Sequence, residues 1–528
     1  MSGAKASGRR PSAFSSMLAL LPGTKSGLRR ITAQRLTPLK PHALCAVSVR
    51  DTEERRRRMS SPRLLRAALL ALILQLTAAV GDAQQSADRI YVRRIEFLGV
   101  TRTNDEVLRR EMRQIEGTFL NPTALEESRI HLERLPSVER ATVAVAAVPG
   151  SDNVVDVVVT IAEKPTRRYG VGGGYASALR ASVNAYFAND NLFGSGQRVY
   201  VATEASELGS LVEASHTNPY AFQSGVSRTI SLSSREVNKV TADASSIDAD
   251  LLDGRLEYAY PITPRQNVSL GVGLRRTLLD AGPDSSEQIR DWIAANGEPV
   301  ASAAPSTEFN ELDLLLRWRY DTRNHDVFPE QGLEQSIDAR VALPASEVEY
   351  FTLRYDATRY WMVGDRWTAS VHGVAAFGDG LGETTALPPY LNWFAGGPTT
   401  VRGYRGLGPR DSLGNAYGGN LLTAAQLELK TAWPRRWAAR MRSGFFFDVG
   451  NVYSTDGTAF LDAAGQLIDH GFSTSELRSS IGIATEVLMG FGTVRLSYGV
   501  PLNPSDGNGD AALRDRTERF QISFGVDF

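Results

Sequence analysis

Between residues 169 and 528 the sequence alternates between apolar and polar residues in one short segment after another. About sixteen such segments, each long enough for a strand, follow one another. In one of them Leu312, Leu314, Leu316 and Trp318 share one face, and Asp313, Leu315, Arg317 and Arg319 share the other. After residue 83 no run of 18 apolar residues occurs, which excludes a membrane-spanning helix. The chain is therefore either a soluble all-β protein or a β-barrel.

The connections between these segments differ in length. Residues 261–264 and 363–365 are short turns, whereas residues 280–308, 379–417 and 454–476 are longer loops. Short turns on one side and long loops on the other are typical of a transmembrane antiparallel barrel, here with sixteen strands. A soluble sandwich or propeller is the alternative. The leader described next, the lack of cysteine after Cys45 and the terminal Phe528 favour the barrel.

The first 83 residues differ from the rest in charge. They hold 15 basic and 4 acidic residues, whereas the remainder holds 43 basic and 55 acidic residues, with no basic patch for nucleic acid. Residues 59–83 have the arginines, apolar run and small terminal residues of a signal peptide, and a short membrane anchor is the alternative. We expect residues 1–58 to be an unstructured leader. A start codon assigned upstream of Met59 is the simplest explanation, and a cytoplasmic extension or a transit peptide is the other.

Residues 88–165 mix strand and helix in a small domain. Residues 91–97 alternate like a strand, and residues 104–115 have helical spacing with Val107, Leu108, Met112 and Ile115 on one side. Pro122 begins a second helix that Pro136 ends, and two β-branched strands follow. The predicted order is β-α-α-β-β, and the barrel is expected over residues 166–528.

One of the long loops carries an unusual motif. Residues 396–410 read GGPTTVRGYRGLGPR and contain the core Val401, Arg402, Gly403 and Tyr404. Its glycines and prolines weaken both strand and helix. We therefore predict a loop that is folded into the barrel and held there by a buried guanidinium.

Two parts of the chain resemble known families. Residues 95–101 (IEFLGVT), 135–139 (LPSVE) and 157–165 (VVVTIAEKP) resemble the POTRA domain, the polypeptide-transport-associated repeat. The barrel resembles that of BamA-type assembly factors in the bacterial surface antigen superfamily. The matching stretches are residues 191–196 (NLFGSG), 217–220 (TNPY), 321–324 (DTRN), 328–332 (FPEQG) and 396–410.

The resemblance implies that the arginine loop folds back into the lumen and that its arginine pairs with acids on the inner wall. Glu428 and Asp448 match those positions. Both alternate with apolar residues, so their side chains are expected to face the lumen, and two solvated wall residues are the alternative reading. Such relatives usually carry several POTRA repeats, whereas this chain has room for one, which puts membership of a multi-subunit machine in doubt.

The first barrel strand is rich in glycine. Gly170, Gly172, Gly173 and Gly174 offer few cross-strand contacts, so the seam with the last strand, which ends at Phe528, is expected to be weak. A tight bend, or packing against the terminal segment, is the alternative explanation. An open seam exposes a strand edge that can template a client strand.

The expected function is therefore insertion of barrel proteins into the bacterial outer membrane, with the POTRA domain in the periplasm and no nucleotide. The expected partners are unfolded outer-membrane proteins and the lipid bilayer, with periplasmic chaperones or assembly lipoproteins as further candidates. A secretion pore of the two-partner type is the alternative, although residues 84–88 are too short for its plug helix.

No enzymatic site is expected. A lipase fusion would need a Gly-x-Ser-x-Gly elbow and a further domain, and neither precedes residue 88. The six histidines are scattered without metal-binding spacing, and residues 172–174 lack the Lys-Ser/Thr pair of a phosphate loop. We therefore predict no metal and no cofactor.

Overall fold

The computed structural model describes residues 90–525, except 178–179, 223–224, 242, 303, 435–436, 438, 463 and 490–491. The predicted leader and signal peptide (residues 1–83) and Phe528 lie outside the described residues. None of the described helices is both long and apolar enough to cross a membrane.

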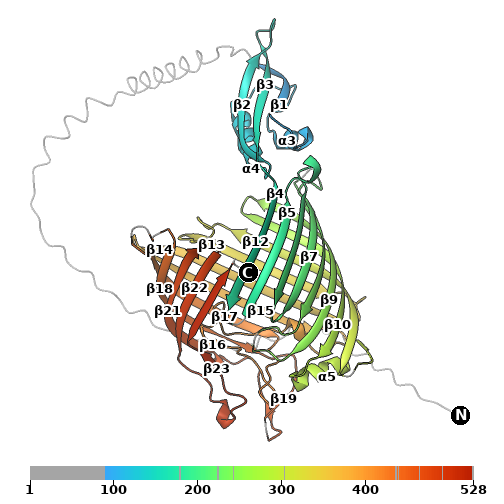
Figure 1. The fold of residues 1–528 in the computed structure, drawn as a ribbon, viewed down its shortest axis with the longest axis vertical. Coiled ribbons are helices and arrows are strands. Elements are labelled where there is room, and N and C mark those ends of the chain that lie inside the picture. The colour runs from blue at the N-terminus through green and yellow to red at the C-terminus, as the bar shows by residue number, and fades with distance from the viewer. Residues whose placement is uncertain are drawn as a thin grey trace, which may run out of the picture. The chain divides into compact units, whose positions relative to one another are not determined.

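The first part of the described chain is a small sheet with two helices (Figure 1). Its elements are β1 (Tyr91–Leu98), α3 (Asp105–Glu111), α4 (Pro122–Arg134), β2 (Val138–Ala147) and β3 (Val154–Glu163). The sheet order is β1-β3-β2, with β3 parallel to β1 and antiparallel to β2. Fully buried Val92, Leu108, Leu132 and Val157 belong to its core. The predicted β-α-α-β-β order is confirmed.

The first helix is shorter than predicted. It ends at Glu111 and leaves Met112 extended, so the expected helix over residues 104–115 is wrong at its carboxyl end. The backbone N–H groups of Arg113 and Gln114 donate to the Ser128 hydroxyl on α4 instead of continuing the helix. Ile115 is consequently 64% exposed rather than packed on an apolar helix face.

Sixteen strands of the described chain close into an antiparallel barrel, which confirms the predicted architecture (Figure 1). The strands are β4 (Arg167–Ala176), β5 (Arg180–Asn189), β6 (Arg198–Ser206), β7 (Gly209–Asn218), β8 (Ser227–Val237), β9 (Ile247–Thr263), β10 (Gln266–Ala281), β12 (Ser306–Asp321), β13 (Gly332–Ala342), β14 (Tyr350–Val363), β15 (Trp367–Gly380), β17 (Leu421–Ala432), β18 (Met441–Tyr453), β21 (Arg478–Met489), β22 (Gly492–Pro501) and β24 (Phe520–Gly525).

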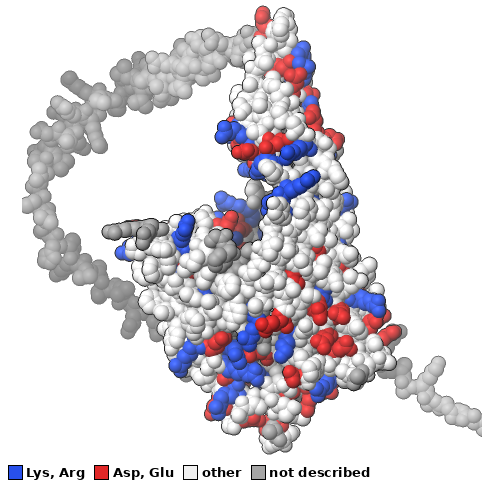
Figure 2. All heavy atoms as spheres, viewed as in Figure 1, with Lys and Arg blue, Asp and Glu red and all other residues white. Residues whose placement is uncertain are grey.

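The alternation along each strand separates an apolar outside from a polar inside. On β12, outward Leu314 and Leu316 are 45% and 41% exposed, whereas inward Glu311 and Asp313 are 2% and 0% exposed. Exposed leucines and buried acids invert the pattern of a soluble protein and fit a wall that faces lipid. In Figure 2 the barrel wall over β4–β7 carries few charged side chains, and charges gather toward the end where β16, β23 and α5 lie.

The long loops build a packed layer at one end of the barrel. Residues 280–308, expected to be a loop, contain helix α5 (Glu287–Ala295) and the short strand β11 (Glu298–Pro299). Trp292 of α5 is 3% exposed, and its indole N–H donates to the Ala386 carbonyl at 3.0 Å. The helix forms because Ser286 caps its start and its apolar side chains are buried against the loops.

The remaining elements are short. Strand β16 (Gly403–Arg405) pairs with β23 (Arg516–Glu518), and β19 (Phe460–Leu461) pairs with β20 (Leu467–Ile468). The 3-10 turns are η2 (Leu192–Gly194), η3 (Pro389–Leu391), η5 (Thr474–Glu476) and η6 (Gly507–Gly509).

Candidate functional site

The loop between β15 and β17 carries the motif singled out in the sequence. Val401 and Tyr404 are both 0% exposed, and Arg402 is 5% exposed. Val401 and Tyr404 pack with Leu422 of β17 and Val452 of β18 in one apolar cluster. Burial of these side chains removes the motif from solvent and seats it against the inner wall.

Arg402 makes contact with both acids predicted as its partners. Its Nε and Nη2 donate to the two carboxylate oxygens of Asp448, both at 2.7 Å, and its backbone N–H donates to Asp448 Oδ2 at 2.9 Å. Its Nη1 donates to Glu428 Oε1 at 2.6 Å. Two-pronged, charge-assisted bonds of this kind are directional, so they set the position of the loop as well as its charge balance.

An aromatic ring completes the arginine site. The guanidinium carbon of Arg402 lies 3.6 Å from the centroid of the Phe446 ring, a cation–π contact. Phe446 is 3% exposed, whereas its neighbours Phe445 and Phe447 are 60% and 37% exposed. Phe446 therefore points inward with Asp448. The period of two along β18 is the sequence signal that places Phe446 on the same face as Asp448.

The ion pair continues into a chain of charges along the wall. Lys430 Nζ lies 2.5 Å from Glu428 Oε2 and 2.8 Å from Glu486 Oε1. Glu428 thus sits between two cations, Arg402 and Lys430. Sequence reasoning missed Lys430 and Glu486, although Lys430 shares the face of Glu428 two residues along the strand.

Gly403 and Tyr404 attach the motif to the last strands. Gly403 has a φ of 86°, a conformation that favours glycine. A Cβ on Gly403 would lie 3.2 Å from the backbone of Gly499 on β22, so the loop and the strand are in backbone contact through these two glycines. The Tyr404 carbonyl accepts a hydrogen bond from Gln521 Nε2 of β24 at 2.9 Å. The loop is thereby bound to strands on either side of β21, the two pairs β17–β18 and β22–β24.

A loop from the other half of the barrel also reaches the motif. Asp243, which follows β8, lies 2.9 Å from Arg405 Nε and 3.6 Å from Arg516 Nη1 and is 8% exposed. The backbone N–H of Ser245 donates to the Ala416 carbonyl at 2.9 Å. No sequence pattern had indicated this acid, because loop-to-loop contacts have no periodicity.

The predicted seam lies between β4 and β24. Among the described residues the two strands share two paired positions, Ala176 with Ser523 and Tyr175 with Phe524. By comparison β4 shares ten with β5, and β22 shares six with β24. The described part of the seam is therefore the shortest pairing of these three.

The four glycines of β4 lie opposite β5. A Cβ on Gly170 would lie 2.5 Å from the Tyr186 ring, and one on Gly172 would lie 2.5 Å from Asn184 Oδ1. Gly173 and Gly174 pair with Val183 and Ser182. Close packing of large β5 side chains thus accounts for two of the glycines.

No three His, Cys, Asp or Glu side chains in the described part of the chain gather as a metal site would require.

The pattern of the Omp85 superfamily domain matches residues 191–528 of this sequence. The chain belongs to the Omp85 superfamily. Residues 90–164 match the POTRA domain described as a surface antigen variable number repeat. The family identity predicted from the motifs is confirmed.

Several relatives of this Omp85 chain carry the name outer membrane protein assembly factor BamA. The one from Neisseria meningitidis serogroup B is 25% identical over 466 residues, which cover 83% of this chain and 57% of the relative. The one from Neorickettsia risticii is 24% identical over 447 residues and covers 83% and 55%. The chain thus spans little more than half the length of these relatives.

A solved structure agrees with this assignment. The crystal structure of BamA from Haemophilus ducreyi lacking POTRA domains 1–3 superposes with a TM-score of 0.73 at 26% identity, covering 83% of this chain and 85% of that one. This Omp85 chain is accordingly an outer-membrane protein of the BamA type, with its POTRA domain in the periplasm.

Proposed function

We propose that this protein inserts β-barrel proteins into the outer membrane through the seam between β4 and β24. The observation that carries the proposal is the short pairing at the seam, two positions among the described residues against ten for β4 with β5. Across the described residues, fewer ladder hydrogen bonds and fewer cross-strand side-chain pairs have to be given up at this junction than between β4 and β5.

An opened seam exposes the backbone groups that a client strand needs for pairing. The freed N–H and C=O groups of β4 and β24 are a template to which a client strand adds by backbone pairing. The client folds as its own pairing replaces the template, so the process needs no nucleotide, cofactor or catalytic residue. The clients are unfolded outer-membrane proteins, and periplasmic chaperones or assembly lipoproteins are the candidate delivery partners. The assembly-factor names of the relatives support this reading.

In this proposal the arginine loop holds the wall while the seam opens. Arg402 bonds to β17 and β18, and Tyr404 bonds to Gln521 on β24. These contacts tie β24 to the barrel from inside, independently of its pairing with β4. The edge of β24 then keeps its position when it is exposed.

The test is a disulfide cross-link that prevents β4 and β24 from separating. Tyr175→Cys with Phe524→Cys places two thiols at a paired position of the seam, where Cα atoms of paired strands lie within disulfide range. Cys45, the one cysteine of the chain, is replaced by serine. Cells depleted of the native protein receive this variant, and the outer-membrane levels of several barrel proteins are measured. We expect those levels to fall when the disulfide forms and to recover with a reductant.

The matched control is Ala185→Cys with Thr203→Cys, a paired position between β5 and β6. It cross-links the wall away from the seam and should leave client levels unchanged. If the seam disulfide forms and clients still accumulate normally, lateral insertion is wrong. If depletion removes a single secreted substrate and spares other barrels, the protein is a secretion pore instead.

A further inference from the structure

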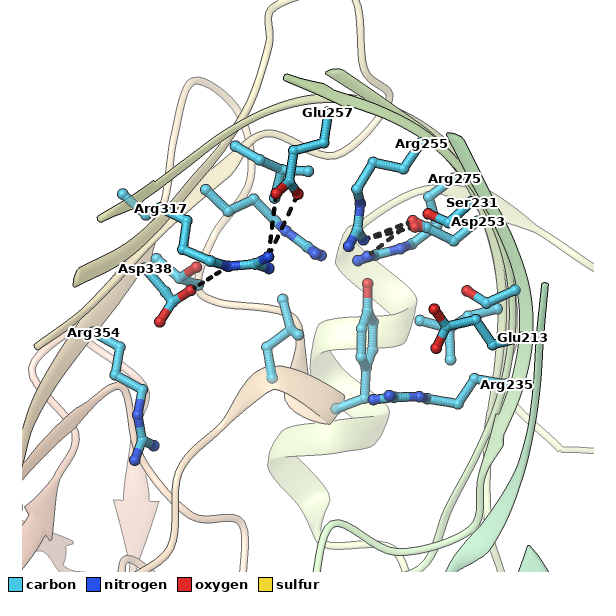
Figure 3. Close-up of a pocket in the computed structure, with 18 of the residues that line it drawn as sticks. Glu213, Ser231, Arg235, Asp253, Arg255, Glu257, Arg275, Arg317, Asp338 and Arg354 are labelled. Carbon is cyan, nitrogen blue, oxygen red and sulfur yellow. Dashed lines mark hydrogen bonds and ion pairs between the residues drawn. The ribbon is translucent and has the colours of Figure 1, made fainter. Parts of the chain in front are cut away.

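A cavity of about 450 Å³ lies inside the barrel, lined by β7–β10 and β12–β14 together with residues 390, 391 and 393 (Figure 3). It shares no lining residue with the space around Arg402. Nothing in the proposed insertion mechanism uses it.

The described lining of this cavity has more cations than anions. Six arginines from six strands face four acids. The arginines are Arg235, Arg255, Arg275, Arg317, Arg340 and Arg354, and the acids are Glu213, Asp253, Glu257 and Asp338. In Figure 3 Arg255 and Arg275 extend into the space from one wall and Arg317 from the other.

Arg275 is buried but poorly satisfied. It is 8% exposed, and its Nε has no hydrogen-bond partner. Its other contacts are long: 3.4 Å to the Tyr350 hydroxyl, 3.7 Å to Asp253 and 3.9 Å to Glu311. Glu311 lies behind the arginine and is not part of the lining. A guanidinium held this loosely retains donor capacity toward the cavity.

Two neighbouring arginines, Arg255 and Arg235, also have hydrogen-bond donors or charge without a partner. Arg255 binds both oxygens of Asp253 through Nη2, which leaves its buried Nε without a partner. Arg235 lines the cavity and forms no ion pair with any described residue. Arg340 and Arg354 pair with Asp313 and Asp356, which lie outside the lining. The charge without an ion pair is therefore that of Arg235, and it lies in the same cavity as the unused Nε donors of Arg255 and Arg275.

We propose that this cavity binds a small, multiply charged oxyanion of the phosphate class. Guanidinium groups pair with phosphate oxygens through two parallel hydrogen bonds, and arginine is the residue best suited to that geometry. A tetrahedral oxyanion presents acceptors in several directions, which matches donors that converge from several strands, whereas a carboxylate presents two oxygens in one plane. The volume lies within the range of small-ligand sites.

The test uses the full chain refolded in detergent at low salt, with inorganic pyrophosphate as the probe in a calorimetric titration. We expect saturable binding with one pyrophosphate per chain. Arg235→Gln should weaken that binding at least tenfold, because a charge and its donors are lost without stranding a buried acid. Arg275→Gln should weaken it similarly if it still folds, as judged by its heat-modifiable gel mobility.

The matched control is Arg276→Gln, one residue along β10. Arg276 points to the other face of the strand, where it pairs with Glu308, so its loss should leave pyrophosphate affinity unchanged. A short-chain lipid phosphate in the same titration identifies the source, since displacement of pyrophosphate by it assigns the site to a headgroup. Absence of saturable binding, or an equal loss of affinity in Arg235→Gln and Arg276→Gln, would overturn the proposal.

Discussion

At the scale of single residues, Arg402 is held in the lumen by several contacts at once. Its guanidinium is bonded to two carboxylates and stacked on an aromatic ring, and little of it reaches solvent. Burial makes each partner dependent on the others, because a buried charge that loses its partner is not rescued by water.

We predict strong coupling between Arg402 and Asp448. Arg402→Ala should lower the free energy of unfolding by about 3–5 kcal/mol because it leaves Asp448 buried and unpaired. Asp448→Ala should lower the free energy of unfolding by a similar amount, because it leaves Arg402 without its main partner. The double variant should be little less stable than either single variant. The midpoint of heat-modifiable gel mobility measures this. Arg276→Ala with Glu308→Ala is the exposed control and should show almost no coupling. Additive losses at Arg402 and Asp448 would mean that the two residues do not stabilise each other.

His470 predicts a pH dependence for the loop that follows β18. Burial lowers the pKa of His470 to about 4, against a small opposing effect of Asp469. Its ring packs edge-on against Phe460, and its Nε2 has no hydrogen-bond partner. The folded loop therefore excludes the proton that the unfolded loop binds below its ordinary pKa of about 6.5.

The stabilising contribution of neutral His470 is complete above pH 6.5 and is lost as the pH falls from 6.5 to 4. The loss is at most about 3 kcal/mol. We expect amide hydrogen exchange in the β19–β20 hairpin, corrected for the intrinsic effect of pH, to show a lower free energy of local opening at pH 5 than at pH 7. His470→Gln should abolish that difference. A difference of the same size in His470→Gln would assign the pH effect to another group.

The residues of the arginine site show what a sequence can reveal. Arg402, Glu428 and Asp448 are identifiable because a glycine-rich loop and an alternating strand each leave a local pattern. Lys430 follows from the same alternation. Asp243 does not, because it contacts Arg405 from a loop more than a hundred residues earlier, and such a contact depends on how the closed barrel brings its loops together.

At the scale of elements, a glycine on β4 leaves space for a side chain on the neighbouring strand β5. Gly170 leaves room for the Tyr186 ring, whereas a Cβ at Gly173 would meet its nearest atom, a backbone oxygen of Ser182, at 3.4 Å. The barrel strands could be located from their alternation, while α5 could not, since its nine residues are stabilised by loops distant in sequence.

We therefore expect different outcomes for two substitutions on β4. Gly170→Ala should lower the free energy of unfolding by about 1–3 kcal/mol, because the methyl group displaces the Tyr186 ring. Gly173→Ala should have little effect, or stabilise slightly by restricting the unfolded chain. Chemical unfolding in detergent measures both. In a protein that already carries Tyr186→Ala, adding Gly170→Ala should no longer lower the free energy of unfolding, because the ring that the methyl group displaces is absent. Equal effects at both glycines would show that backbone freedom, rather than space, is what β4 requires.

At the scale of the whole molecule, the described loops pack against one another at one end of the barrel. Asp243 joins the β8–β9 loop to the arginine loop, and α5 with its apolar partners fills the space beside them.

Removing the Asp243 contact should make the barrel leaky. Asp243→Ala leaves Arg405 and Arg516 without this carboxylate and separates the two loops. We expect a higher single-channel conductance in planar bilayers, because the β8–β9 loop and the arginine loop are no longer held together. Glu308→Gln, which removes a partly exposed acid that pairs with Arg276 away from these loops, should conduct like the native protein. Unchanged conductance in Asp243→Ala would mean that the apolar contacts alone keep this end closed.

The attachment of the arginine loop also dictates an order of folding. Outside the loop itself, the hydrogen-bond partners of Arg402 and Tyr404 named above and in the β21–β24 region all come later in the chain. They are Glu428, Asp448, Ser479, Asn503 and Gln521. The loop cannot settle until the carboxyl-terminal strands exist in their final register, and contacts of such long sequence separation form late. The loop therefore reaches its final position only after the last strand has paired. In a chain truncated before β24, the loop would lack the contact with Gln521 and the barrel would remain open.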